Sequence, residues 1–114
     1  MNLTRETVER RALGPALIVS PEGEVDMHES PKLRAALLAE IAKKPALVIV
    51  DLAKVSFIDS SGVATLIEAL KRAKAAGLSL VLCGLNAKVK DVFEISRLDG
   101  VFSIVPARSD ALGA

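Results

Sequence analysis

The chain has 114 residues and a formal net charge of +1, and apolar residues make up 51% of it. This is the balance of one ordinary globular domain, so we predict a single domain over residues 1–114. The near-neutral charge excludes the strongly basic surface that nucleic-acid-binding proteins use, and no apolar run approaches the ~18 residues of a membrane span. We therefore expect a cytoplasmic protein with no direct nucleic-acid contact and no membrane insertion.

The first 45 residues predict a β-hairpin followed by a helix. Partial alternation from Thr4 to Leu13 favours an edge strand, Gly14-Pro15 is a turn signal, and residues 16–20 read as a second strand. Because proline cannot donate to a strand ladder, we expect the second strand to break at Pro21. Ser30-Pro31 has the pattern of an N-cap followed by proline at the first helical position. The helix behind it has apolar residues at helical spacing, at Leu33, Leu37, Leu38 and Ile41.

The most informative stretch runs from Ala46 to Ala75. It opens with five apolar residues, which predict a strand buried on both faces, and it closes with a helical pattern. The apolar positions of that helix are Val63, Leu66, Ile67 and Leu70. Between strand and helix, the run Asp59-Ser60-Ser61-Gly62 places a carboxylate and two hydroxyls at a helix N-terminus. We expect this run to lie at the carboxyl edge of the sheet, beyond a strand from Ala46 to Asp51, where functional loops gather.

The remaining residues continue the alternation of strands and helices. We expect a strand over residues 78–82, a third helix, a short strand over residues 101–105, and at most a frayed helical turn over residues 109–114. The third helix is indicated by Val89, Val92, Phe93 and Ser96, with Ile95 and Leu98 on its flank. The order predicts an α/β fold whose mixed sheet is parallel apart from the opening hairpin, with helices covering it. We interpret the one cysteine, Cys83, as a buried and inert thiol.

The sequence contains no pattern that indicates catalysis. His28 is the only histidine and belongs to a loop separate from the serines, and the nucleophile elbow, phosphate loop and dinucleotide fingerprint are all absent. Asp26, His28 and Glu29 are close in sequence, but three neighbouring loop residues are more typical of a solvated loop than of a metal site. We therefore predict a protein that is not an enzyme and that binds neither metal nor cofactor.

Two uses of Ser60 and Ser61 remain open at this point. Both hydroxyls could simply cap the helix that follows them. Alternatively, Ser60 could accept a phosphoryl group, which would add about −1.5 to −2 charge units beside Asp59. A helix N-terminus tolerates such a charge, so the modification would change the surface and leave the fold intact.

The segment from Val48 to Leu70, above all Phe57-Ile58-Asp59-Ser60-Ser61-Gly62-Val63, resembles the STAS domain of anti-sigma factor antagonists. The segment Gly23-Glu24-Val25-Asp26 is similar to the family's Gly-Glu-Leu-Asp segment, and the likeness extends through Val101-Phe102. It implies a STAS-type fold with Ser60 as the phosphoacceptor and Asp59 as its acidic neighbour. It further implies a switch or partner surface that contains Asp26, Asp59, Ser61, Gly62 and Val63.

The same resemblance implies a mechanism and a set of protein partners. The unphosphorylated antagonist binds an anti-sigma factor that is also an ATP-binding serine kinase, and it thereby regulates transcription indirectly. The kinase switches the antagonist off by phosphorylation, and a phosphatase restores it. We expect a monomer or weak dimer, with Val63, Leu66 and the helix face around Phe93 divided between core and partner surface.

Two departures and two alternatives accompany this interpretation. Pro21 leaves the position of Asp26 relative to Ser60 open, and the chain stops at Ala114, where family members usually carry a longer final helix. Similar STAS domains also serve as adaptor subunits of lipid-transporting ABC systems and as modules of large signalling assemblies. Many transporter-type members have threonine or another residue at the phosphoacceptor position, so Ser60 favours the antagonist.

Overall fold

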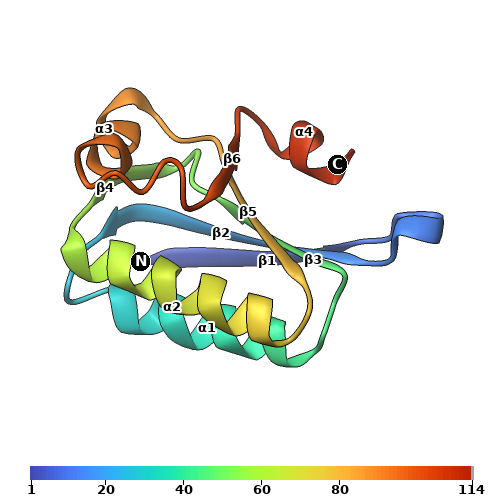
Figure 1. Ribbon diagram of the computed structural model, residues 1–114. Coiled ribbons are helices and arrows are strands. Elements are labelled where there is room, and N and C mark those ends of the chain that lie inside the picture. Colours follow the sequence, from blue (N-terminus) through green and yellow to red (C-terminus); the bar gives the residue numbers. More distant parts are fainter. Residues whose placement is uncertain (114) are drawn as a thin grey trace.

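The computed structural model describes residues 1–113, which form six strands and four helices (Figure 1). A short 3₁₀ turn at Arg11–Leu13 closes the opening hairpin. The elements are β1 (Asn2–Val8), β2 (Ala16–Val25), α1 (Ser30–Ala42), β3 (Leu47–Asp51), β4 (Val55–Ile58), α2 (Ser60–Ala75), β5 (Ser79–Cys83), α3 (Ala87–Ile95), β6 (Ser103–Val105) and α4 (Arg108–Leu112).

The strands form one mixed sheet in the order β1-β2-β3-β5-β6. β1 is antiparallel to β2, whereas the other neighbours in this order are parallel. β4 lies off this path and pairs in parallel with the second half of β2. The predicted α/β fold with an opening hairpin and a parallel remainder is thus confirmed. The prediction missed β4, because its four residues were taken as the connection to the helix; the Asp59 run therefore follows β4 and not β3.

The prediction that Pro21 breaks the second strand is wrong. β2 is ten residues long, from Ala16 to Val25, and it continues through Pro21 without a break. Val19 is the last residue paired with β3, and Gly23 is the first paired with β4. Pro21 lies in the interval between these two partners, so its missing N–H removes no ladder bond on that side of the strand. One long strand therefore spans two neighbours, and its far end reaches the edge where α2 begins.

Helices cover both faces of the sheet (Figure 1). α1 and α2 lie side by side on one face, where a bidentate ion pair joins Arg34 to Glu68 at 2.7 and 2.8 Å. α3 contacts β4, and its Val89 and Phe93 complete the same core. The main cluster includes Val19, Val48, Val50, Leu80 and Leu82 of the sheet with Leu33, Leu37, Leu66 and Ala69 of the helices. α4 covers the opposite face, above a smaller cluster.

α4 is a five-residue helix at the place where at most a frayed turn was expected. The sequence signal that was overlooked is Arg108, whose guanidinium donates to Asp51 at 2.9 Å, to Glu6 at 2.9 Å and to the Ser20 hydroxyl at 3.1 Å. These bonds attach the helix to three strands. Ala114 lies outside the described residues.

Cys83 lies in the smaller cluster beneath α4 and is fully buried, as predicted. Burial, and secondarily the neighbouring Asp51 carboxylate, raises the pKa of its thiol to about 11. A thiol with so high a pKa is almost wholly protonated near neutral pH, which accounts for an inert cysteine. Within residues 1–113, none of the helices combines the length and the apolar character needed to span a bilayer.

The start of α2 comes unusually close to β2 and β4 at Gly62. A methyl group on Gly62 would lie 2.6 Å from Ile58 Cγ1, 2.8 Å from Val25 Cγ1 and 2.9 Å from the Val25 carbonyl oxygen. Only glycine therefore allows the first turn of α2 to pack at this depth. The close approach fixes where the residues immediately before Gly62 are displayed.

We expect Gly62→Ala to lower the free energy of unfolding by about 2 kcal/mol or more, because the added methyl overpacks the core. The matched control is Gly100→Ala, where the added Cβ meets nothing within 4 Å. That variant should stay within about 0.5 kcal/mol of the parent. Urea unfolding of both variants checks this, and equal stability of the two would contradict the close approach of α2.

Candidate functional site

Asp59 is the N-cap of α2, with extended backbone angles of φ −104° and ψ −174°. Its Oδ1 accepts hydrogen bonds from the backbone N–H of Ser61 at 2.9 Å and of Gly62 at 3.2 Å, and from the Ser61 hydroxyl. These two N–H groups belong to the first turn, where an α-helix has no internal acceptors for them. The carboxylate therefore satisfies the helix N-terminus from within the chain.

The second oxygen of Asp59 ties this junction to the loop after β2. Oδ2 accepts from the backbone N–H of Met27 at 3.1 Å. The strand register explains why the two segments meet: Val25 pairs with Ile58, so the residues that follow both strands emerge side by side. A β-bulge at Gly23, whose φ is +94°, adjusts that register.

Asp26 follows Val25 and therefore lies near Asp59, at the carboxyl edge formed by β2 and β4. The resemblance implied that Asp26 belongs to this surface, and the uninterrupted β2 strand shows how it reaches it in spite of Pro21. The Oδ1 of Asp26 accepts from the N–H groups of His28 at 3.0 Å and Glu29 at 2.9 Å, which closes a turn. The N-cap of α1 is Glu29 rather than the expected Ser30, and Ser30 is buried as the first helical residue. The Asp26 turn orders the chain at that point in place of a serine cap.

The pKa of Asp59 is held below its ordinary value of 3.8. The largest cause is the hydrogen bond from the Ser61 hydroxyl; partial burial opposes it, and the N–H groups of Gly62, Ser61 and Met27 reinforce the lowering. All of these donors favour the ionised form. Asp59 is therefore a carboxylate at neutral pH, and the site has a permanent negative charge.

Ser60 and Ser61 differ in spite of being neighbours. The Ser61 side chain is half-buried and its hydroxyl donates to Asp59, so it is occupied within the fold. Ser60 is exposed as the first residue of α2, and within residues 1–113 its hydroxyl has no hydrogen-bond partner. The capping interpretation thus applies to Asp59 with Ser61, whereas Ser60 presents a free hydroxyl to solvent.

Gly62 and Val63, which we expected on the partner surface, lie beneath it. Val63 is 6% exposed and belongs to the main core, and Gly62 is buried. Leu66 and Phe93 are fully buried as well, so the expected division of these apolar residues between core and surface is wrong. The helical spacing could not reveal this, because it identifies a face without saying how completely that face is covered.

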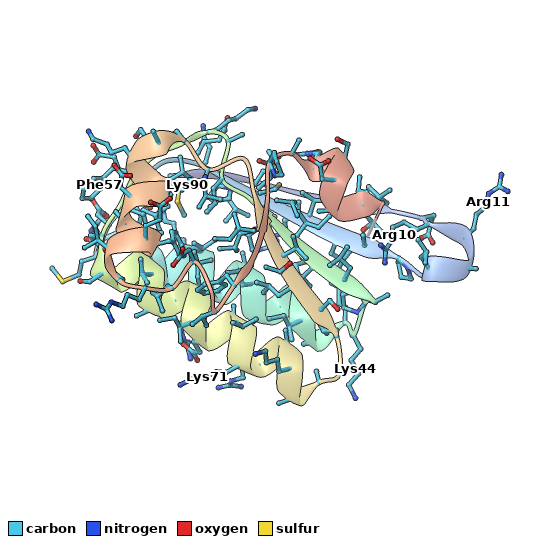
Figure 2. All side chains as sticks on the ribbon, turned by 45° about the horizontal axis from the view of Figure 1, so that its top comes forward. Arg10, Arg11, Lys44, Phe57, Lys71 and Lys90 are labelled. Atoms are coloured by element: carbon cyan, nitrogen blue, oxygen red, sulfur yellow. The ribbon has the colours of Figure 1, made fainter. Side chains whose placement is uncertain are left out.

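The exposed apolar residues at this edge were not among those that we expected on the partner surface. Met27 is 78% exposed and its N–H is bonded to Asp59, and Phe57, on β4, is 40% exposed (Figure 2). The sequence did contain one signal for this surface: aromatic residues make up only 3% of the chain, and one of them, Phe57, lies just before the Asp59 run. A large apolar side chain exposed beside a polar site is typical of a surface that binds another protein.

His28 is not placed to act as a base for either serine, because it is exposed and within residues 1–113 its ring makes no hydrogen bond to Ser60 or Ser61. The Ser61 hydroxyl does contact a carboxylate, that of Asp59, but the lowered pKa of this carboxyl group makes it a weak base. The Ser60 hydroxyl has no base in contact within the same residues, and such a serine is a weak nucleophile. Among the same residues, no group of three or more His, Cys, Asp and Glu side chains is placed to hold a metal ion. The arrangement is that of an exposed hydroxyl, on Ser60, beside the ionised carboxylate of Asp59.

Comparison with known proteins gives consistent similarities. A sequence model of the STAS domain matches residues 7–111. The anti-sigma-B factor antagonist of Listeria monocytogenes is 32% identical over 104 residues, which cover 91% of this chain and 90% of that protein.

Solved structures share the fold over almost the whole chain. TM1081 from Thermotoga maritima has a TM-score of 0.86 at 21% identity, covering 97% of this chain and 92% of that one. The anti-sigma factor antagonist SpoIIAA of Bacillus matches in its unphosphorylated form with a TM-score of 0.73 at 21% identity, covering 98% of this chain and 96% of that one. Its phosphorylated form matches with a TM-score of 0.71 at 22% identity, and each chain is covered to 96%.

The lowered pKa of Asp59 predicts a pH-dependent contribution to stability. A carboxyl group with a depressed pKa in the folded state stabilises the protein above its unfolded pKa, near 3.8, and loses this contribution as the pH falls through the folded pKa. The variant Asp59→Asn retains an acceptor but carries no charge. We expect the difference in unfolding free energy between parent and variant to be constant above about pH 5 and to shrink as the pH falls below that value and through the folded pKa. A difference that stays constant from about pH 5 to about pH 2 would contradict the prediction.

Proposed function

The chain belongs to the STAS domain family, and from this premise we propose that it is an anti-sigma factor antagonist controlled by phosphorylation of Ser60. In its unphosphorylated form it binds an anti-sigma factor that is also an ATP-binding serine kinase, and so regulates transcription indirectly. Phosphorylation of Ser60 by that kinase ends the binding, and a phosphatase restores it. The protein acts in the cytoplasm as a monomer or weak dimer.

The observation that carries this proposal is the contrast between the two serines. A kinase needs a hydroxyl that can reach its active site, and Ser60 is exposed without a hydrogen-bond partner in the described residues. The Ser61 hydroxyl is directed at Asp59 instead. The similarity to antagonists such as that of Listeria monocytogenes adds the partner class, since that protein acts on an anti-sigma factor.

A phosphate on Ser60 would act through repulsion and bulk. The N–H groups of Ser61 and Gly62 are already bonded to Asp59, so they are not free to bind the phosphate. The doubly charged group would therefore stay in solvent, beside the carboxylates of Asp59 and Asp26. There it would repel an acidic partner surface, and it would have to be desolvated before an apolar partner surface could cover it. The fold would persist, in keeping with the matches to both the phosphorylated and unphosphorylated forms of SpoIIAA.

The partner surface consists of Ser60 with the residues around it. Met27 and Phe57 provide exposed apolar area, while Asp26 and Asp59 provide charge. Aromatic residues and methionine are enriched in protein interfaces relative to the rest of the surface. Ser61, Gly62 and Val63 support this surface from below: they fix the first turn of α2 and so the direction in which Ser60 points.

The phosphorylation site is tested by mass spectrometry of the protein isolated from its own cells, with Ser60→Ala and Ser61→Ala as a matched pair. We expect Ser60→Ala to abolish phosphate incorporation and to change the unfolding free energy by no more than about 0.5 kcal/mol, because its hydroxyl has no partner to lose. Ser60→Asp should weaken binding to the co-purifying kinase and leave thermal stability nearly unchanged.

Other outcomes would contradict the proposal in different ways. Loss of phosphate in Ser61→Ala equal to that in Ser60→Ala would mean that the modified residue could be Ser61. A large loss of stability in Ser60→Ala would mean that the Ser60 side chain is structural. An unmodified protein that co-purifies with a transporter ATPase would favour the adaptor of a lipid-transporting ABC system. Association with a large signalling complex would favour a module of such an assembly.

The apolar part of the surface is tested separately. Phe57→Ala and Met27→Ala should each weaken binding of the kinase about tenfold, as truncation of a central interface residue commonly does. Leu13→Ala is the control, because Leu13 is 54% exposed but lies in the hairpin turn at the far end of the sheet (Figure 1). Calorimetric titration measures all three, and an equal effect of Leu13→Ala would show that the binding surface lies elsewhere.

A further inference from the structure

A cavity lies at the end of the molecule remote from Ser60. It has a volume of about 430 Å³ and opens beside the first half of β5, between the C-terminal end of α2 and the opening hairpin. Three of its apolar lining residues, Leu70, Leu78 and Leu80, belong to the main core beneath α1 and α2. The other two, Leu47 and Val81, belong to the smaller cluster beneath α4, so the cavity lies where the two faces of the sheet meet at its edge. Sites for small molecules occupy about 300–1,000 Å³, so this cavity is of a size that suits a small ligand.

The apolar side chains around this cavity are not completely sealed. Most core residues are 0–2% exposed, whereas the five apolar side chains just named keep between 4% and 8%. One structural reason is that β6 is short: its first residue, Ser103, pairs with Val81, so the β5 residues Ser79 and Leu80 have no strand beyond them within the described chain. Apolar surface at this edge would be removed from water by a ligand with an aliphatic body.

Two cations stand at the same cavity, and its lining contains no carboxylate. They are Arg10 from the hairpin and Lys74 from the last turn of α2. Neither forms an ion pair within residues 1–113, whereas Arg5, Arg34, Lys43, Lys54 and Arg108 all do. Positive charge beside apolar surface, without a paired carboxylate in the part of the chain that the structure describes, complements an anionic group.

The geometry of Arg10 shows that it is held in place and still has free donors. Its Nε donates to the Gly14 carbonyl at 3.0 Å, one terminal nitrogen donates to Leu13 at 3.1 Å, and the other donates to Leu112 at 3.4 Å. A guanidinium has five N–H donors, so two remain after these three bonds. Carbonyl oxygens do not neutralise the charge, and a carboxylate can accept two N–H groups at once.

From these observations we propose that the cavity binds a small anionic amphiphile, an aliphatic chain with one anionic head, with the chain along Leu70, Leu78 and Leu80 and the head at Lys74 and Arg10. The site is independent of the Ser60 switch: Figure 2 shows Arg10 and Lys44 far from Phe57, which marks the switch surface. Lys44 adds further positive charge at this end of the molecule and would attract an anion before it binds (Figure 2).

The test is a titration of the full chain with sodium decanoate, followed by the ¹H–¹³C shifts of leucine and valine methyl groups. We expect saturable shifts at the cavity methyl groups and none at Val25 or Val63. Lys74→Gln should weaken binding about fivefold, as expected for the loss of one partly exposed charge pair. Lys71→Gln is the matched control, one turn earlier on α2 and absent from the cavity lining, and should stay within about twofold.

Chemical variation of the probe separates the two parts of the site. Shortening decanoate to octanoate should weaken binding by about two- to fourfold per methylene removed, because less aliphatic surface is buried. Decyl phosphate in place of decanoate should bind as well or better if the head site accepts any anion, whereas decanol, which lacks the charge, should bind much more weakly.

Several results would overturn the proposal. These are the absence of saturable shifts up to millimolar decanoate, equal effects of Lys71→Gln and Lys74→Gln, or decanol binding as tightly as decanoate. Phosphatidylglycerol vesicles that bind the protein while free decanoate does not would mean that this end docks on a membrane surface. Each variant changes an exposed lysine, so the fold is expected to persist, and circular dichroism of both variants confirms it before the titration.

Discussion

The hydrogen bonds accepted by the Asp59 carboxylate hold together the edge of the sheet that carries the candidate site. The carboxylate accepts four hydrogen bonds, from Met27, from Gly62 and twice from Ser61, and so joins the loop after β2 to the first turn of α2. Without it, two N–H groups at the start of α2 would lack acceptors, and the β2–α1 loop would lose its attachment. Because these donors also keep the carboxylate ionised, the structural cap and the charge of the site are one feature.

Four consecutive residues, 59–62, divide two roles among them. Asp59, Ser61 and Gly62 hold the start of α2 in place, and Ser60 is exposed to solvent. Asp59 and Ser61 point into the junction and Gly62 lies against β2 and β4, so the geometry is set without Ser60. A modification of Ser60 can therefore change what the surface attracts or repels without removing any bond that the fold needs. Two exposed apolar residues, Met27 and Phe57, lie at the same edge and are part of the partner surface that we propose.

The sequence was most informative where local chemistry determines structure. The apolar runs predicted the central parallel strands, helical spacing predicted α2, and Asp59 before Ser-Ser-Gly predicted a capped helix N-terminus. Tertiary pairing was harder to see. β4 is only four residues long and exists because β2 extends past β3, and Pro21 is tolerated because it falls between the two partners of that strand. The exposure of Phe57 and the burial of Val63 likewise depend on where α3 and α2 pack, which periodicity does not encode.

The most direct test of a switch that acts on the surface alone is to compare the protein carrying phosphoserine at position 60 with the unmodified chain. Amide shifts and the free energy of unfolding should be measured on the same samples. We predict shift changes confined to residues near 26–29 and 57–64, and an unfolding free energy that changes by no more than about 0.5 kcal/mol. Changes that spread through the sheet to α4, or a loss of several kcal/mol, would contradict it and would mean that the phosphate acts by rearranging the fold.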